Sequence, residues 1–163
     1  MKSFLMTLIT ACLLTAAPIT ITYAQNFDKA VKAYEVGDYT TAAKEFRLLA
    51  EQGDAGAQNI LGLMYDQGEG VTQDYVEAVR WHRLAAEQGD ADAQNNLGYR
   101  YSFGEGVPQD YVLAHMWFNI AAASGYENAL KARDLQASQM TSDQIAEAQQ
   151  HARDCMARSL KGC

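Results

Sequence analysis

The stretch Ala57-Gln58-Asn59-Ile60-Leu61-Gly62-Leu63-Met64-Tyr65-Asp66-Gln67-Gly68-Glu69-Gly70 decides the fold, because most of it returns 36 residues later between Ala93 and Gly106. A fixed period of this length is typical of stacked helical repeats. When 57–92 is compared with 93–128, 19 of 36 positions are identical. The identical positions therefore indicate a packing scheme that both copies share.

Apolar residues recur at helical spacing along the whole chain after residue 25, which predicts an all-α solenoid of about eight helices. We expect one helical-repeat domain over 25–163. Its expected parts are a first helix pair, two longer repeats and C-terminal capping helices, at 25–53, 54–89, 90–125 and 126–163. The first helix is expected at 26–36.

Several short patterns predict where these helices begin and end. Asp74 with Glu77, and Thr141 with Gln144, have the spacing of a capping box. The last helix is expected to continue until Gly162.

Glycine recurs inside a predicted helix at Gly62 and Gly98. Because Gly in a helix interior costs about 1 kcal/mol relative to Ala, its repeated use predicts a second helix that passes too close for a Cβ atom. Ala78, Ala85 and Ala86 are the expected small residues of that second helix.

The net charge of −7, without a cluster of Lys and Arg, argues against nucleic acid as the main partner. Residues 1–24 have the pattern of a signal peptide, with Lys2 before an apolar run and a small-residue site before Gln25. We therefore expect an exported protein, periplasmic or secreted, with no membrane span in the mature chain. The alternative is a lipoprotein acylated at Cys12, which follows a lipobox-like sequence.

Two cysteines, Cys155 and Cys163, remain after the expected cleavage. An even number of cysteines in an exported chain favours a disulfide between them. Two unpaired thiols and a bridge between chains are the alternatives.

The repeated motif resembles the Sel1-like repeat, a relative of the tetratricopeptide repeat. The residues that carry the resemblance are Leu61-Gly62-x-x-Tyr65-x-x-Gly68-x-Gly70-Val71-x-Gln73-Asp74-Tyr75, Ala78, Trp81 and Ala85-Ala86-Glu87-Gln88-Gly89, with their copies from Leu97 to Gly125. The first pair matches only in part, since it lacks the Gly-x-Gly loop.

The resemblance implies a superhelix of paired helices with a concave groove and a role as an adaptor or scaffold that binds a protein or peptide. It implies neither an enzyme nor a cofactor. One cysteine-rich branch of the family has been linked to β-lactam binding and hydrolysis, and this is one alternative function. The chain departs from that branch because it has no Cys between residues 13 and 154. A self-associating structural component of the cell envelope is the other alternative.

In proteins of this kind the first helix of each pair lines the groove. We expect the positions on those helices that packing does not require to contact a ligand. The predicted groove residues are Asn59, Leu63, Gln67, Asn95, Tyr99 and Phe103.

The histidines have plainer explanations than catalysis or metal binding. His82 occupies the position of Phe46 and Phe118 in the other pairs, which indicates an aromatic core residue. His151 and Cys155 lie four residues apart and would present two metal ligands on one helix face. Since no second such pair occurs, we predict no metal site.

Overall fold

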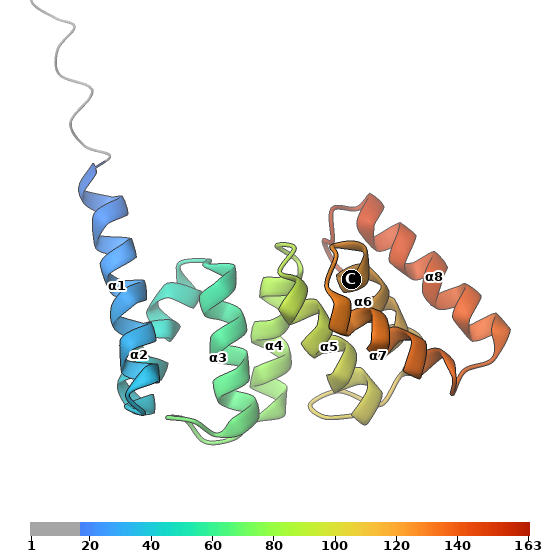
Figure 1. Ribbon diagram of the computed structural model, residues 1–163, viewed down its shortest axis with the longest axis horizontal. Helices are drawn as coiled ribbons and strands as arrows, with labels where there is room; N and C mark the ends of the chain where they lie inside the picture. The colour runs from blue at the N-terminus through green and yellow to red at the C-terminus, as the bar shows by residue number, and fades with distance from the viewer. Residues whose placement is uncertain (1–16) are drawn as a thin grey trace, which may run out of the picture.

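The computed structural model describes residues 17–163, which form eight helices in a row (Figure 1). Their bounds are α1 (Ala17–Glu35), α2 (Tyr39–Glu51), α3 (Ala55–Gln67), α4 (Tyr75–Ala86), α5 (Ala91–Phe103), α6 (Tyr111–Ala123), α7 (Glu127–Ala137) and α8 (Ser142–Ala157).

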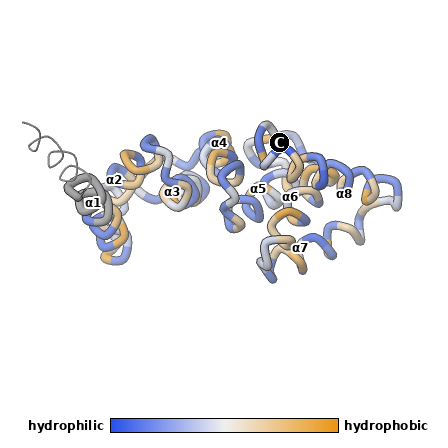
Figure 2. Tube along the Cα trace, turned by 90° about the horizontal axis from the view of Figure 1, so that it is seen from above, coloured by the Kyte–Doolittle hydropathy of each residue, from blue (hydrophilic) through white to orange (hydrophobic). Residues whose placement is uncertain are grey.

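Each helix packs against the next one along the chain from α1 to α7, and α8 returns to pack against α6. Both α7 and α8 therefore cover α6 and close this end of the row. Figures 1 and 2 both show these two helices beside α6. The predicted all-α solenoid of helix pairs is confirmed. Apolar residues, orange in Figure 2, recur along the helices, and they form the core between successive pairs.

Aspartate side chains begin most of the helices. Asp38, Asp54, Asp74, Asp90 and Asp110 each accept a hydrogen bond from a backbone amide in the first turn of the following helix. This arrangement satisfies amides that have no partner within the helix.

One of the two predicted capping boxes is complete. Thr141 and Gln144 exchange both hydrogen bonds at the start of α8. Asp74 accepts from the amide of Glu77, but the Glu77 carboxylate is bound by Arg80 on the next turn, so the second box is only half formed.

The helix glycines are explained by an aromatic ring rather than by a small-residue contact. A Cβ atom added to Gly62 would lie 2.6 Å from Cε1 of His82, and one added to Gly98 would overlap the ring of Phe118. Ala78 and Ala85 are fully buried as expected, but the space beside each glycine is filled by the ring at the equivalent position of the second helix.

The Gly-Glu-Gly loops join neighbouring pairs as well as the two helices of one pair. A Cβ atom at Gly70 would overlap the backbone carbonyl of Tyr39, and one at Gly106 would overlap that of Tyr75. Each loop thus lies against the first residue of the second helix in the preceding pair.

The first loop also contacts α1. The Tyr34 hydroxyl donates a 2.7 Å hydrogen bond to the Glu69 carboxylate, which raises the pKa of Tyr34 to about 12. The loop that joins α3 to α4 therefore also contacts both helices of the first pair, α1 and α2.

The first helix begins earlier, and the last helix ends earlier, than the sequence predicts. Helix α1 begins at Ala17 rather than near residue 26, so it passes through the expected cleavage point before Gln25. Residues 1–16 of the predicted signal peptide, including Cys12, lie outside the described residues. Within 17–163, no helix combines the length and apolarity needed to span a membrane.

Helix α8 ends at Ala157, five residues before Gly162, because Ser159 and Leu160 adopt positive φ angles of 53° and 66° and turn the chain back. This turn brings Cys163 to Cys155, and the two form a disulfide with a Cα–Cα distance of 5.7 Å. Cys155 is fully buried against α6, so the bridge holds the chain end on the core.

Candidate functional site

The structure divides the six predicted groove residues into two groups. Asn59 and Asn95 are buried, with 8% and 6% of their surface exposed, and Leu63 is half-buried. Gln67, Tyr99 and Phe103 are exposed. The two asparagines, which are predicted to contact a ligand, thus expose little surface in this structure.

Asn59 belongs to a buried polar network between α3, α4 and α5. Its Oδ1 accepts from Nδ2 of Asn96 at 3.1 Å and lies 3.0 Å from Nδ1 of His82. The other ring nitrogen of His82 lies 3.0 Å from a carboxylate oxygen of Asp66. His82 is fully buried, as the prediction of a core aromatic residue requires, and its two hydrogen bonds were not foreseen.

Arg100 extends this network toward the surface. Its guanidinium pairs with Asp66 at 3.3 Å and with Glu105 at 2.6 Å. It also lies 5.2 Å from the centre of the Tyr75 ring, within the range of a cation–π contact. Arg100 therefore fills the junction between the pair α3–α4 and α5.

Tyr99 and Phe103 form an aromatic pair on the exposed side of α5. Their rings are nearly parallel, with an interplanar angle of 7° and centroids 6.3 Å apart. Tyr99 also packs edge-on against Phe118 of α6 at 5.1 Å. The contact with α6 holds Tyr99 in place, while 65% of the Phe103 surface remains exposed.

These two rings border a pocket of about 240 Å³ between α5, α6 and α7, which we call the α5–α7 pocket. Its lining residues are Tyr99, Ser102, Phe103, Gln109, Tyr111, Phe118, Ala132, Leu135, Gln136 and Gln139. None of these side chains carries a formal charge. Leu135, on α7, is also exposed and extends the apolar rim.

Sequence reasoning missed the residues that α7 contributes. The motif residues Leu, Gly and Tyr are lost in α7, so this helix was interpreted only as a cap. The 36-residue spacing nevertheless continues, because Tyr126, which precedes α7, follows Asp90, which precedes α5, at that interval. Leu135 therefore lies at the position of Tyr99, and Gln136 at that of Arg100. Extending the comparison by one more period was the signal that would have found them.

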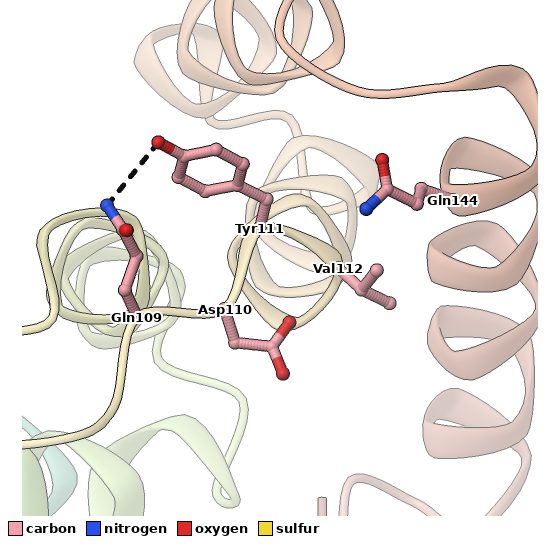
Figure 3. A pocket seen from close by; sticks show the side chains of 5 residues that line it. All are labelled: Gln109, Asp110, Tyr111, Val112 and Gln144. Atoms are coloured by element: carbon pink, nitrogen blue, oxygen red, sulfur yellow. Dashed lines mark hydrogen bonds between the residues drawn. The ribbon is translucent and has the colours of Figure 1, made fainter.

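A second pocket, of about 270 Å³, lies where α6 begins (Figure 3). It is lined by Gln109, Asp110, Tyr111, Val112 and, from α8, Gln144. In the two preceding pairs the equivalent residues, Tyr39 and Tyr75, are covered by Gly-Glu-Gly loops. No Gly-x-Gly sequence follows residue 106, so the end of the repeat array leaves this surface open.

The described residues hold no cluster of three or more His, Cys, Asp or Glu side chains suited to a metal ion. Cys155 is bonded to Cys163, so it is not free to form a pair of ligands with His151. His115 is buried in α6, and the loss of solvent, together with the positive charge of Arg133, lowers its pKa.

Comparison with known families agrees with this architecture. Residues 55–90 and 91–126 each match the family model described as Sel1 repeat. The chain therefore contains two consecutive Sel1 repeats. Sel1 repeats generally form non-catalytic scaffolds that mediate protein interactions. No curated protein matches the sequence.

Two solved structures show the same fold. A protective antigen present in uropathogenic Escherichia coli strains, displaying an SLR fold, is 28% identical over 85% of this chain, with a TM-score of 0.79. A Sel1 repeat protein from Oxalobacter formigenes is 38% identical over 56% of this chain, with a TM-score of 0.55. The chain spans 31% and 27% of the lengths of these two proteins.

Proposed function

We propose that this chain is a non-catalytic adaptor that binds a protein or peptide through the surface around the α5–α7 pocket. The observation that carries the proposal is the exposed apolar rim formed by Tyr99, Phe103 and Leu135. The fold supports it, because repeat solenoids offer extended surfaces for partners.

An exposed aromatic pair needs an explanation in a folded protein. Neighbouring apolar side chains left in water favour association, and clustered exposed apolar surface marks interaction sites. Aromatic residues also contribute most strongly when a partner buries them. Phe103 is suited to this role because its ring stacks on Tyr99, which limits the conformations that the Phe103 side chain can adopt before a partner binds.

The chemistry of the lining favours binding over catalysis. The ten lining residues include no His, Cys, Asp, Glu, Lys or Arg. The hydroxyl of Ser102 donates to Oε1 of Gln136 at 2.6 Å, so it is not placed against a general base.

Site-specific photo-crosslinking tests the location of the binding surface. A photoreactive phenylalanine at position 103 is expected to capture a discrete partner in cells that express the chain. The same group at Val76, whose exposed fraction is 64% against 65% for Phe103, serves as the matched control. Equal capture from both positions, or capture from Val76 alone, would contradict the proposal.

We further propose that the protein acts in an oxidising compartment outside the cytoplasm. The disulfide between Cys155 and Cys163 supports this, because such bridges persist mainly in exported proteins. Alkylation of free thiols in acid-quenched cells is expected to leave both cysteines unmodified. Modification of both in the native host would contradict export.

A further inference from the structure

The α5–α7 pocket occupies the space that Arg100 and its partners fill in the preceding interface. At the 36-residue interval, Asp66 is followed by Ser102, Asn96 by Ala132, and Arg100 by Gln136. Each replacement is smaller or shorter and none is charged. The aromatic ring beneath is kept, since Tyr111 follows Tyr75. The pocket is therefore an open version of a junction that the same chain also builds in a closed form.

Gln136 contacts Ser102 at the place where Arg100 contacts Asp66 in the preceding interface, but donor and acceptor are reversed. Its Oε1 accepts from the Ser102 hydroxyl at 2.6 Å, whereas the Arg100 guanidinium is the cationic partner of the Asp66 carboxylate at 3.3 Å. The other end of the amide, Nε2, has no hydrogen-bond partner although only 6% of the residue is exposed. A buried donor without a partner is costly, and an acceptor brought by a ligand would relieve that cost.

The lining also restricts the kind of group that can enter. A charged group would be buried without a counter-ion, because no lining side chain is charged. The rings of Tyr99, Phe103, Tyr111 and Phe118 provide an apolar wall suited to one large side chain. A carboxylate is further disfavoured by the net charge of −7 on the chain.

We propose that the α5–α7 pocket binds one uncharged apolar residue of a peptide, whose backbone carbonyl oxygen accepts a hydrogen bond from Nε2 of Gln136. The inference rests on the proposed adaptor function and names the chemical class of its ligand.

Small peptide mimics test this with the full chain. N-acetyl-phenylalaninamide, titrated into isotope-labelled protein, is expected to shift the Gln136 side-chain amide signals in a saturable way. Ethylbenzene has the ring without a hydrogen-bond acceptor, and we expect it to bind about fivefold more weakly. N-acetyl-alaninamide and N-acetyl-argininamide are expected to bind more weakly still. No saturable shift at Gln136, or equal binding of all four probes, would overturn the inference.

The preceding interface supplies a variant that closes the pocket without emptying the core. The double substitution Gln136→Arg with Ser102→Asp recreates the pair of Arg100 and Asp66, so we expect a folded protein that no longer binds N-acetyl-phenylalaninamide. Gln136→Glu, which keeps the shape but replaces the donor by an acceptor, is expected to weaken binding at least about fivefold. Wild-type affinity in either folded variant would overturn the inference.

The two proposals fail in different ways. If the partner captured at position 103 binds the closed-pocket variant as tightly as the wild type, the adaptor function stands and the proposed ligand class is wrong. If no partner is captured at position 103 but the small probes bind at Gln136, the adaptor proposal fails and the pocket assignment stands.

Discussion

The imidazole of His82 lies directly over Gly62, with each ring nitrogen 3.0 Å from an oxygen, one of Asn59 and one of Asp66. The ring therefore cannot move aside without breaking a buried hydrogen bond. In the next pair Phe118 covers Gly98 in the same way but has no polar partner. Two rings of different chemistry, His82 and Phe118, thus each require a glycine at the equivalent position of the neighbouring helix.

Substitution of Gly62 tests this contact. Gly62→Ala should lower the free energy of unfolding by roughly 1–3 kcal/mol, because the new methyl group meets the fixed ring and outweighs the helix propensity of Ala. Gly56→Ala in the same helix has only an ordinary contact with Asp54 at 3.4 Å, and it should be neutral or stabilising by up to about 1 kcal/mol. Urea denaturation measures both, and equal effects would contradict the account.

His115 gives a pH-dependent prediction at the same scale. Burial lowers the pKa of His115 in the folded state, so below its ordinary value of about 6.5 the unfolded chain binds more protons than the folded one. The stability contributed by neutral His115 is therefore lost as pH falls below about 6.5.

The variant His115→Val introduces the residue found at the equivalent Val79. It should reduce the slope of unfolding free energy against pH in this range by up to about 1.4 kcal/mol per pH unit. An identical slope in both proteins, measured by urea denaturation at several pH values, would show that His115 is not responsible.

At the scale of elements, the Gly-Glu-Gly loops and the C-terminal turn connect segments that the repeat motif alone does not join. Gly106 lies against the first residue of α4, in the preceding pair, and Leu160 turns the chain so that Cys163 reaches Cys155. Both are backbone features, with little dependence on side-chain packing.

Alanine substitutions at Gly106 and Gly89 distinguish the effect of the loop contact from that of backbone strain. Both have positive φ angles, 74° and 93°, so alanine at either position should cost about 1 kcal/mol or more. Only at Gly106 does the added Cβ also overlap a backbone carbonyl, that of Tyr75, whereas Gly89 has open space. Gly106→Ala should therefore lower the melting temperature clearly more than Gly89→Ala, and the reverse order would rule out the contact between pairs.

Removal of the disulfide has a bounded effect. The bridge spans a sequence separation of 8 residues, and loop closure of that length contributes about 2.5 kcal/mol. The double variant Cys155→Ala with Cys163→Ser should lose no more than this in chemical denaturation and should keep its helical circular dichroism. Global unfolding at 25 °C would mean that the C-terminal turn is essential to the core.

At the scale of the whole molecule, the repeat pattern predicted the helices, their order and most of their ends. Periodicity identifies the buried face of each helix, and Asp residues mark most of the helix starts. The pattern did not predict the burial of Asn59, because its partners His82 and Asn96 meet it only in the folded chain.

The α5–α7 pocket was only half predictable. Tyr99 and Phe103 are among the predicted groove residues because they lie on the first helix of a pair, at positions that packing does not require. The contribution of α7 was not seen, since the pocket results from several small replacements that act together across an interface. The 36-residue interval identifies the positions on α7, but only the three-dimensional structure shows that these replacements together leave a pocket.

The affinity of the partner captured at position 103 tests the central claim most directly. Calorimetric titration of the wild type and of the double variant Tyr99→Ala with Phe103→Ala should show binding weakened by about tenfold or more, with a retained helical fold. The same dissociation constant for both proteins would contradict the assignment of this surface as the binding site.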